Sequence, residues 1–345
     1  MKTIGSFFLG EKTFEVRDME FSAPGEGEVL IKVMAAGICG TDVHIYHGEK
    51  GSADVTPPIV LGHEFSGVVE AIGPGVTTVK PGDAVTLDPN IYCGKCRPCR
   101  MGKKQNCEHL FALGVNRDGG FARYCMAPQE QCFPLGDGVS FEEGAMAEPL
   151  ACALHGIDRA RIQPGQSVLV VGGGTIGLLM VQLCRLSGAS AVLLSEPVAA
   201  RREIGKRVGA DGCIDPVTED LPQRIRQITG RDGVDVVIEC VGRPAAVTQA
   251  FSAAGLGATV VLFSVPGVED TVPLPLFDVY KKELKILGSF INPDTHQRAV
   301  NLLRGGRLKI QELITHRYGI HHVEDAVLMQ MSSQSIKVMV LPQEE

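Results

Sequence analysis

The sequence predicts an α/β protein in which a doubly wound parallel sheet is joined to a second, mainly β domain with a barrel-like fold. Between residues 167 and 290, short apolar runs alternate with segments of helical periodicity, which indicates parallel strands covered by helices on both faces. From residue 1 to about 150, short alternating strands are interrupted by Gly and Pro, as in a mainly β, barrel-like fold. We therefore expect the doubly wound domain over residues 153–291 and the β domain over residues 1–152 and 292–345.

The composition of the whole chain narrows the classes of protein to consider. A length of 345 residues favours two domains, and 44% hydrophobic with 21% charged residues suits a soluble globular fold. The net charge of −7 argues against nucleic acid as the main partner, since binding phosphates needs clustered Lys and Arg. No apolar run reaches about 18 residues and the first residues lack a signal-peptide pattern, so we expect no membrane span and a cytoplasmic location. The eleven cysteines, an odd number, suggest reduced thiols and metal ligands rather than disulfides.

Six apolar runs are expected to form the strands of the parallel sheet. They are SVLVV (167–171), AVLLS (191–195), GCID (212–215), DVVIEC (235–240), ATVVLF (258–263) and KILGSF (285–290). Between the first two, LLMVQLCRLSG has the spacing of a helix that ends at Gly188. Further on, residues 295–330 look helical apart from a central Gly-Gly break, and IKVMVL (336–341) returns to a strand that we expect to pack on the first half of the chain.

A glycine-rich motif follows the first of these strands and opens the first helix. Its residues are Gly172, Gly173, Gly174, Thr175, Ile176 and Gly177. In the G-x-G-x-x-G pattern, the first glycine allows a tight turn, the second lets the backbone approach a pyrophosphate, and the third lets helix and strand pack closely. The N-terminus of the helix then presents unpaired N–H groups to the phosphates. Because strand, turn and helix occur in the required order, the sequence predicts a bound dinucleotide.

The acidic residue Glu196 indicates which dinucleotide is bound. It lies nineteen residues beyond Gly177, at the end of the second strand, where a carboxylate can bind both ribose hydroxyls of NAD and would repel the 2′-phosphate of NADP. Arg201 and Arg202 follow closely, and an arginine can pair with that phosphate, although both also suit the solvent-facing side of a helix. We expect NAD in preference to NADP.

Four cysteines lie close together in the stretch CGKCRPCRMGKKQNC. Cys93, Cys96, Cys99 and Cys107 have the spacing C-x2-C-x2-C-x7-C, which can close a tetrahedral thiolate shell around Zn²⁺ and leave no open position. The Lys and Arg residues of the same stretch would offset the excess negative charge. An iron–sulfur cluster is the alternative, but the Cys-Pro continuation and a second cysteine set are missing. The sequence therefore predicts a structural zinc in a lobe over residues 90–110.

A second set of metal-ligand residue types is scattered through the first half of the chain. The candidates are Cys39, His63, Glu64 and Glu148, with Thr41 and His44 close to the first. A thiolate, an imidazole and a carboxylate would give zinc three ligands and leave a fourth position open, as at catalytic zinc sites. Taken singly, they could be a buried thiol, a turn histidine and a helix-start carboxylate. The dinucleotide motif elsewhere in the chain is what favours their combination.

The order of these motifs resembles that of the zinc-dependent medium-chain alcohol dehydrogenases. GICGTDVH, GHEFSGVV, the four-cysteine lobe, EPLACALH and GGGTIG cover essentially the whole chain, and GICGTDVHIYHG and EPLACALHG are most similar to the polyol (sorbitol-type) and threonine dehydrogenase branch. The resemblance implies a GroES-like catalytic domain completed by the C-terminal segment, and a Rossmann domain that binds the nicotinamide cofactor. It also implies one catalytic and one structural zinc ion and a homo-oligomer, either a dimer or a tetramer.

The resemblance assigns roles to individual residues. Cys39 and His63 match two ligands of the catalytic zinc. Glu148 matches the glutamate that the polyol branch uses as a third ligand, and Glu64 matches a glutamate that either binds the zinc or lies beside it. The residues implied at the cofactor are Glu196 and Arg201 at the adenosine ribose, and Phe263, Ser264, Val265, Ser289, Phe290 and Ile291 along the nicotinamide.

The reaction that this resemblance implies is oxidation of a secondary alcohol by hydride transfer to the nicotinamide. Zinc would lower the pKa of the substrate hydroxyl, and Thr41 would pass the proton through a cofactor ribose hydroxyl to His44, which exchanges it with water. A polyol is the expected substrate, with L-threonine and butanediol-type alcohols as alternatives and a zinc-stabilised NAD-binding protein without catalysis as the non-enzyme alternative. Sorbitol itself is disfavoured, because Ile291 and Asn292 stand where sorbitol dehydrogenases carry an Arg-Tyr pair.

Overall fold

The computed structural model describes residues 1–49 and 55–345, and the chain divides into two compact units. The first, which we call the β unit, comprises Met1–Ala151 and Pro293–Glu345, and the second, the α/β unit, comprises Cys152–Asn292. Each division falls one residue from the position expected from the sequence. No helix among the described residues combines the length and the apolar character needed to cross a membrane.

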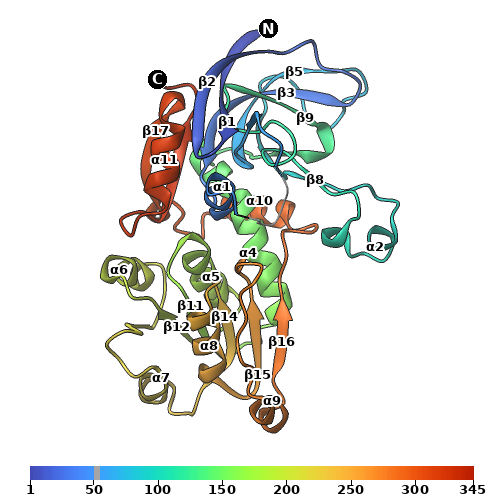
Figure 1. The fold of residues 1–345 in the computed structure, drawn as a ribbon. Coiled ribbons are helices and arrows are strands. Elements are labelled where there is room, and N and C mark those ends of the chain that lie inside the picture. The colour runs from blue at the N-terminus through green and yellow to red at the C-terminus, as the bar shows by residue number, and fades with distance from the viewer. Residues whose placement is uncertain (50–54) are drawn as a thin grey trace. The chain divides into compact units, whose positions relative to one another are not determined.

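The β unit is built mainly from antiparallel strands (Figure 1). They are β1 (Lys2–Gly10), β2 (Thr13–Glu20), β3 (Glu28–Gly37), β4 (Ile59–Val60), β5 (Glu64–Ile72), β6 (Ala84–Leu87), β7 (Asn90–Ile91), β8 (Phe111–Ala112), β9 (Tyr124–Pro128), β10 (Cys132–Pro134), β17 (Ile314–Gly319) and β18 (Lys337–Leu341). The largest sheet among the described residues has the order β10-β6-β5-β3-β18-β17, with β9 also paired to β3. Smaller sheets have the orders β2-β1-β4 and β7-β8.

Short helices connect the strands of the β unit. They are α1 (Gly40–Tyr46), α2 (Arg97–Arg100), α3 (Phe141–Ala145), α10 (His296–Arg304) and α11 (Val323–Gln330), with the 3-10 helices η1 (Lys104–Asn106), η2 (Gln129–Gln131), η3 (Gln311–Leu313) and η4 (Ile320–His322). Helix α4 (Ala147–Ala160) begins in the β unit and continues into the α/β unit. Strand residues such as Phe65, Val338 and Val340 are fully buried in one apolar cluster, so the N- and C-terminal segments share a core.

The C-terminal segment lies inside the large sheet, because β18 pairs with β3 and places Met339 opposite Gly37. The expectation that residues 295–330 are helical apart from the Gly-Gly break was wrong in part. Helix α10 ends before the two glycines, but Ile314–Gly319 forms β17, which pairs in parallel with β18. The sequence ITHRYG contains β-branched and aromatic residues, and such residues favour a strand when a partner strand is available.

The α/β unit contains one parallel sheet of the order β13-β12-β11-β14-β15-β16. Its elements are β11 (Ser167–Val171), α5 (Thr175–Leu186), β12 (Ala191–Ser195), α6 (Ala199–Arg207), β13 (Gly212–Ile214), α7 (Leu221–Thr229), β14 (Val234–Glu239), α8 (Pro244–Ala253), β15 (Ala254–Leu262), α9 (Leu276–Lys282) and β16 (Lys285–Gly288). Each predicted apolar run forms a strand, and the strand expected to start at residue 258 starts earlier, at Ala254. The predicted doubly wound parallel sheet is confirmed.

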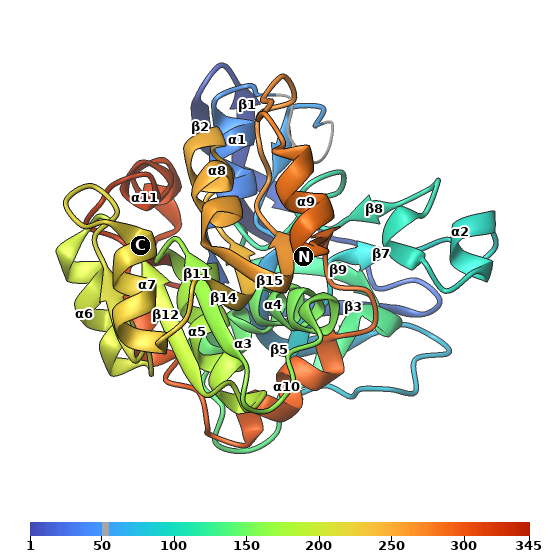
Figure 2. The ribbon, with the colours of Figure 1, turned by 90° about the horizontal axis from the view of Figure 1, so that it is seen from below.

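Helices cover both faces of this sheet (Figure 2). Apolar residues of α7 and α8 share a buried cluster with Leu169 and Leu193. Successive strand residues point to opposite faces, and glycines of α5 and α6 approach Val170 and Leu194 on the other face. The carboxyl ends of β11, β12 and β14 therefore meet at one edge, which is where ligands bind in open α/β sheets.

Candidate functional site

Cys39, His63 and Glu64 come together at one end of the large sheet of the β unit. One ligand atom of each residue lies within 4.8 Å of the ligand atoms of the other two. Strands β3 and β5 are paired with Gly37 opposite Glu64, so the residues that follow β3 are neighbours of those that begin β5. The structure thus gathers three of the predicted metal ligands from two separate stretches of the sequence.

Local backbone features hold these residues in place. Gly62, directly before His63, has φ +92°, and a Cβ at this position would lie 2.5 Å from the ring of Phe121. Only glycine fits such a turn without strain. Cys39 is the N-cap of α1, and its backbone N–H donates a hydrogen bond of 2.8 Å to Asp42 Oδ2.

Asp42 is a site residue that the sequence analysis missed. Its side chain is fully buried, and Oδ1 lies 3.7 Å from His63 Nδ1, while neither atom has a hydrogen-bond partner among the described residues. Burial raises the pKa of Asp42 to about 6, and the nearby His63 opposes that rise. With a proton on Nδ1 facing Asp42, the histidine would present Nε2 to a metal ion. The sequence pattern that could have revealed Asp42 is an acidic residue three positions after the N-cap Cys39, which is the spacing of a capping box.

The charges around His63 favour a bound cation. Burial lowers the pKa of His63, but the negative charges of Cys39 and Asp42 outweigh it and raise the pKa well above 6.5. Glu148 adds to this effect. A thiolate, an imidazole and a carboxylate are donors that suit Zn²⁺, and the unsatisfied Nδ1–Oδ1 pair suits an imidazole oriented onto a metal. These residues therefore fit a catalytic zinc ion.

Two carboxylates are candidates for the third ligand. Glu148 lies in the first turn of α4 and is 6% exposed, and its charge acts on His63, but it is outside the 4.8 Å group. Glu64 is inside the group and forms an ion pair with Lys337, which is 2% exposed. Burial lowers the pKa of Lys337, but Glu64 and Cys39 outweigh it and raise the pKa above 10.5. The sequence analysis missed Lys337, whose signal was a charge inside an apolar strand.

The structure places Thr41 and His44, the predicted proton-relay residues, on α1. His44 Nδ1 lies 2.5 Å from Glu49 Oε2, and the His44 side chain is 34% exposed. This contact engages Nδ1 of the partly exposed ring, and a histidine in such a position can exchange a proton with water.

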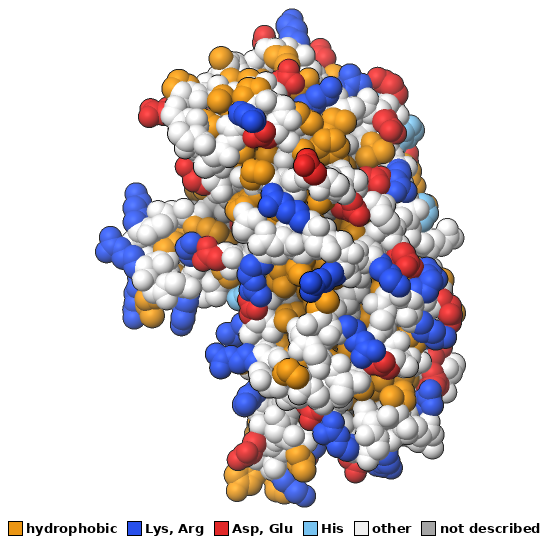
Figure 3. Space-filling model, turned by 180° about the vertical axis from the view of Figure 1, so that it is seen from behind, with side chains coloured by type: hydrophobic (Ala, Val, Ile, Leu, Met, Phe, Trp, Pro, Cys, Tyr) orange, Lys and Arg blue, Asp and Glu red, His pale blue; other side chains and the backbone are white. Residues whose placement is uncertain are grey.

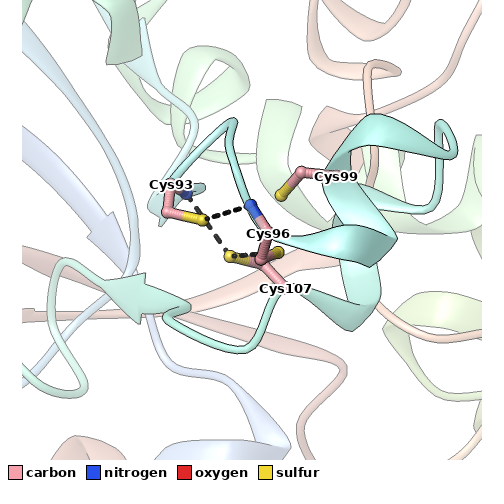
Figure 4. A group of neighbouring side chains, drawn as sticks. All are labelled: Cys93, Cys96, Cys99 and Cys107. Carbon is pink, nitrogen blue, oxygen red and sulfur yellow. Dashed lines mark hydrogen bonds between the residues drawn. The ribbon is translucent and has the colours of Figure 1, made fainter.

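The four cysteines of the lobe form a compact cluster (Figure 4). The sulfur atoms of Cys93, Cys96, Cys99 and Cys107 lie within 4.8 Å of one another. Backbone N–H groups donate to these sulfurs, and those of residues 95 and 96 lower the pKa of Cys93 to about 6. Four sulfurs at such distances fit a closed tetrahedral zinc site, which supports a loop and leaves no position for substrate.

The same lobe carries a concentration of positive charge, visible as the blue side chains on the projecting part of Figure 3. The residues are Lys95, Arg97, Arg100, Lys103 and Lys104. Lys104 Nζ lies 2.6 Å from Asp294 Oδ1, which ties the lobe to the segment before α10. The remaining charges belong to the same stretch of chain as the four cysteines and would offset the negative charge of their thiolates.

The glycine motif of the α/β unit has the geometry that phosphate binding requires. Gly172 has φ +98°, and a Cβ at Gly177 would collide with the carbonyl oxygen of Gly172. By contrast, a Cβ at Gly174 would meet nothing within 4 Å. Gly174 is the N-cap of α5 and makes no side-chain cap, so N–H groups at this helix end can bind an anion.

Glu196, at the end of the neighbouring strand β12, binds the backbone of the glycine turn through its carboxylate. Its carboxylate accepts hydrogen bonds from the N–H groups of Gly173 at 2.7 Å and Val198 at 2.8 Å, and it is 3% exposed. Arg202 donates to the carbonyl oxygen of Glu196 at 2.8 Å and pairs with Asp215 at 3.2 Å. Arg202 thus supports the loop. Arg201, the predicted ribose contact, lies near the start of α6.

The segments predicted to line the nicotinamide follow two neighbouring strands. Phe263, Ser264 and Val265 follow β15, and Ser289, Phe290 and Ile291 follow β16. Ile291 has φ +46°, a conformation that is rare for a β-branched residue and is often found at functional sites. The sequence analysis missed Glu239, whose carboxylate accepts from the N–H groups of Val241 and Gly242 at 2.7 and 2.8 Å and shapes the loop beside Gly172.

Comparison with known proteins identifies the class to which this fold and these sites belong. Residues 25–137 match the family described as alcohol dehydrogenase GroES-like domain, and residues 175–304 match the family described as zinc-binding dehydrogenase. The chain belongs to the zinc-dependent medium-chain alcohol dehydrogenases and is an oxidoreductase, which confirms the family expected from the motifs.

Individual relatives show which members of the family the chain is similar to. A sorbitol dehydrogenase of Bacillus subtilis is 33% identical over 91% of this chain and 90% of its own length. An L-threonine 3-dehydrogenase of Pyrococcus horikoshii is 36% identical over 95% of this chain and 94% of its own. The crystal structure of a zinc-binding dehydrogenase of Sinorhizobium meliloti, bound to NADP, is 40% identical with a TM-score of 0.95, covering 99% of this chain and 100% of that one.

Proposed function

We propose that this protein oxidises a secondary hydroxyl of a polyol to the ketone, with NAD as hydride acceptor. The observation that carries the proposal is the buried group of Cys39, His63 and Glu64, with the charge of Glu148 acting on it. This set offers zinc one thiolate and one imidazole together with carboxylates, and three such ligands leave a position for an alcohol. The similarity to a sorbitol dehydrogenase supports a substrate with several hydroxyls.

The chain's own residues account for the handling of the proton. A zinc ion held by Cys39, His63 and a carboxylate would act as a Lewis acid and lower the pKa of the alcohol hydroxyl. Thr41 can accept a proton through its hydroxyl oxygen and donate its own, and His44 can release a proton to water, with Glu49 close to its Nδ1. Asp42 Oδ1 lies 3.7 Å from His63 Nδ1, and its negative charge favours the tautomer with the proton on Nδ1, which leaves Nε2 for a metal ion.

Preference for NAD over NADP is part of the proposal and rests on Glu196. Its buried carboxylate lies at the end of β12 and already accepts two backbone hydrogen bonds. A 2′-phosphate brought to this carboxylate would face a negative charge, whereas ribose hydroxyls can donate to it. One relative binds NADP in its crystal structure. The rates with NAD and with NADP should therefore be compared directly.

The second candidate substrate is L-threonine. It is supported by the L-threonine 3-dehydrogenase relative, whose identity of 36% is similar to that of the sorbitol dehydrogenase. Butanediol-type alcohols are a third class with the same reacting group, a secondary hydroxyl. Ile291 and Asn292, in place of the Arg-Tyr pair of sorbitol dehydrogenases, favour a polyol other than sorbitol.

A screen of NAD reduction across polyols, diols, L-threonine and simple alcohols tests the substrate assignment. We expect the highest kcat/KM with a polyol, and zinc analysis of about two ions per chain. Cys39→Ser should abolish turnover and leave NAD binding measurable, because Cys39 belongs to the β unit and the glycine motif to the α/β unit. A clear preference for L-threonine would replace the polyol assignment, and turnover that survives in Cys39→Ser would exclude the zinc mechanism.

We also infer that the chain forms a homo-oligomer, a dimer or a tetramer. Leu276, Phe277 and Tyr280 on α9 are 73%, 69% and 81% exposed, and Figure 3 shows hydrophobic side chains at the lower end of the molecule, where Figure 1 places α9. Next to α9 in the chain, β16 is the outer strand of its sheet. An open strand edge beside exposed apolar side chains favours association with a second copy. None of the eleven cysteines, all of which are described in the structure, forms a disulfide, which is compatible with a cytoplasmic location.

A further inference from the structure

The α/β unit contains a cavity that the proposed reaction does not use. Its volume of about 570 Å³ is in the range of small-molecule sites. The walls come from the end of α4, the loop that follows it, and strands β15 and β16. All of these residues belong to the α/β unit, and none is among those proposed above to bind the metal or the cofactor.

Strands β15 and β16 form one wall of the cavity. Thr259 is paired with Lys285 in the sheet. Val260 and Ile286, which follow them, belong to the apolar cluster shared with α7 and α8, and successive strand residues point to opposite faces. Thr259 and Lys285 therefore point to the other face, where the end of α4 lies (Figure 1). Association along the outer edge of β16 would use its backbone and not this face.

The cavity carries an excess of positive charge. Arg159, Arg161 and Lys285 line it, against the single acidic residue Asp158. In the part of the chain that the structure describes, no acidic side chain pairs with Arg161 or Lys285. By contrast, Arg185 in the same unit pairs with an aspartate at 2.8 Å. Unpaired cationic side chains around a cavity favour an anionic ligand.

Arg161 stands at a position that favours glycine. It directly follows α4, and its N–H donates to the carbonyl oxygen of Ile157 at 3.0 Å, which closes the last turn of the helix. Its φ of +51° lies in the left-handed region, where helices usually end in glycine because a Cβ is disfavoured there. An arginine has a conformational cost here that glycine would not have, which suggests that its side chain has a role.

Arg159 is held at the wall of the cavity by a backbone contact. Its Nε donates to the carbonyl oxygen of Gly288 at 3.1 Å, at the end of β16. A guanidinium has further N–H donors for a ligand, and its planar shape suits two parallel hydrogen bonds to a carboxylate or a phosphate. Two arginines and a lysine can therefore bind a ligand with two negative charges.

We propose that this cavity binds a small organic anion with two negative charges, either a dicarboxylate or a phosphate monoester, through Arg159, Arg161 and Lys285. The oxygen atoms of either group accept the hydrogen bonds that these side chains donate. Gln163 and Gln166 add amide groups to the lining for the polar part of the ligand. The site goes beyond the proposed oxidation, because it uses neither the zinc ligands nor the glycine motif.

Calorimetric titration of the full-length, zinc-loaded protein tests the proposal. Saturating NAD occupies the glycine motif, so that an added anion cannot bind there. Succinate and methyl phosphate are the two ligands, and we expect at least one to bind with a Kd of about 1–10 mM, since the cationic side chains are exposed to water. Tighter binding of succinate assigns the site to dicarboxylates, and tighter binding of methyl phosphate assigns it to phosphate esters.

A double variant removes two of the three cationic groups. In Arg161→Gly/Lys285→Gln, glycine suits the backbone at position 161 and glutamine keeps the length of an exposed side chain. We expect the affinity for the anion to fall at least about tenfold. The Kd for NAD should stay unchanged, which shows that the α/β unit is folded.

A second double variant is the matched control. Lys206→Gln/Arg226→Gln also removes two positive charges from the α/β unit, but at exposed side chains on α6 and α7 outside the cavity. It should bind the anion as the unmodified protein does.

Two results would overturn the proposal. One is the absence of binding of both anions to the unmodified protein. The other is an equal affinity in Arg161→Gly/Lys285→Gln, because the anion would then occupy another site, such as the proposed zinc ion. If that variant fails to bind NAD, Lys285→Gln alone supplies the comparison, with an expected fall of about threefold in affinity. The titrations need no alcohol, so they are read independently of the substrate screen.

Discussion

The proposed preference for NAD depends on Glu196, whose carboxylate is buried and accepts hydrogen bonds from two backbone N–H groups. Glu196→Gln keeps a hydrogen-bond acceptor and removes the charge. We expect the ratio of kcat/KM for NAD to that for NADP to fall at least about tenfold, since one tenfold step corresponds to about 1.4 kcal/mol of lost repulsion. Glu203→Gln is the matched control. It makes the same change further along the chain, at an exposed side chain that pairs with Lys206. An unchanged ratio in Glu196→Gln would remove Glu196 from cofactor selection.

His296 is a buried histidine whose protonation opposes folding. It is 1% exposed and packs against the ring of Phe133, with ring centroids 4.8 Å apart, and burial lowers its pKa from 6.5 to about 3. Between these values the unfolded chain binds a proton that the folded chain does not, so the stability contributed by His296 is complete above pH 6.5 and is lost as the pH falls toward 3.

His296→Gln should therefore reduce the acid sensitivity of the β unit. From about pH 6.5 to pH 5, the unmodified protein should lose about 1.5 kcal/mol more unfolding free energy than the variant. Urea unfolding at the two pH values measures this difference. Carboxylate protonation and metal loss act on both proteins alike, so parallel pH dependences would mean that His296 does not control this part of the stability.

At the scale of elements, the turn directly before β5 positions a proposed metal ligand, because Gly62 precedes His63. Gly62→Ala would put a methyl group against Phe121 at a φ of +92°. We expect a loss of about 2–4 kcal/mol in unfolding free energy and a displacement of His63 that lowers zinc content from about two ions to about one. Gly138→Ala is the control, since Gly138 has φ +84° with nothing within 4 Å of an added Cβ. It should cost about 1 kcal/mol and keep both metals, and equal losses in the two variants would rule out a special role for the packing at Phe121.

The elements also differ in how far local sequence specifies them. The strands of the α/β unit could be predicted because each is a continuous apolar run between helical segments. Strand β17 could not, because a neighbouring strand rather than its own pattern makes Ile314–Gly319 extended. The candidate ligands Cys39 and His63 could be proposed only together with the dinucleotide motif and the family resemblance, because each residue type alone also suits a packed turn. The choice between Glu64 and Glu148 as a further ligand could not, because both are carboxylates at the start of an element and only the folded chain brings Glu64 close to Cys39 and His63.

At the scale of the whole molecule, association of chains should depend on α9. Phe277 and Tyr280 expose 69% and 81% of their surfaces, and buried aromatic side chains dominate the energy of interfaces between proteins. Phe277→Asp combined with Tyr280→Ser should weaken self-association by at least about 30-fold, which corresponds to about 2 kcal/mol. Sedimentation velocity across a dilution series measures this shift toward the monomer. Val217→Asp alters an equally exposed residue (78%) before α7 and should leave the mass unchanged. If the aromatic variant keeps the mass of the unmodified protein, its chains associate through another surface.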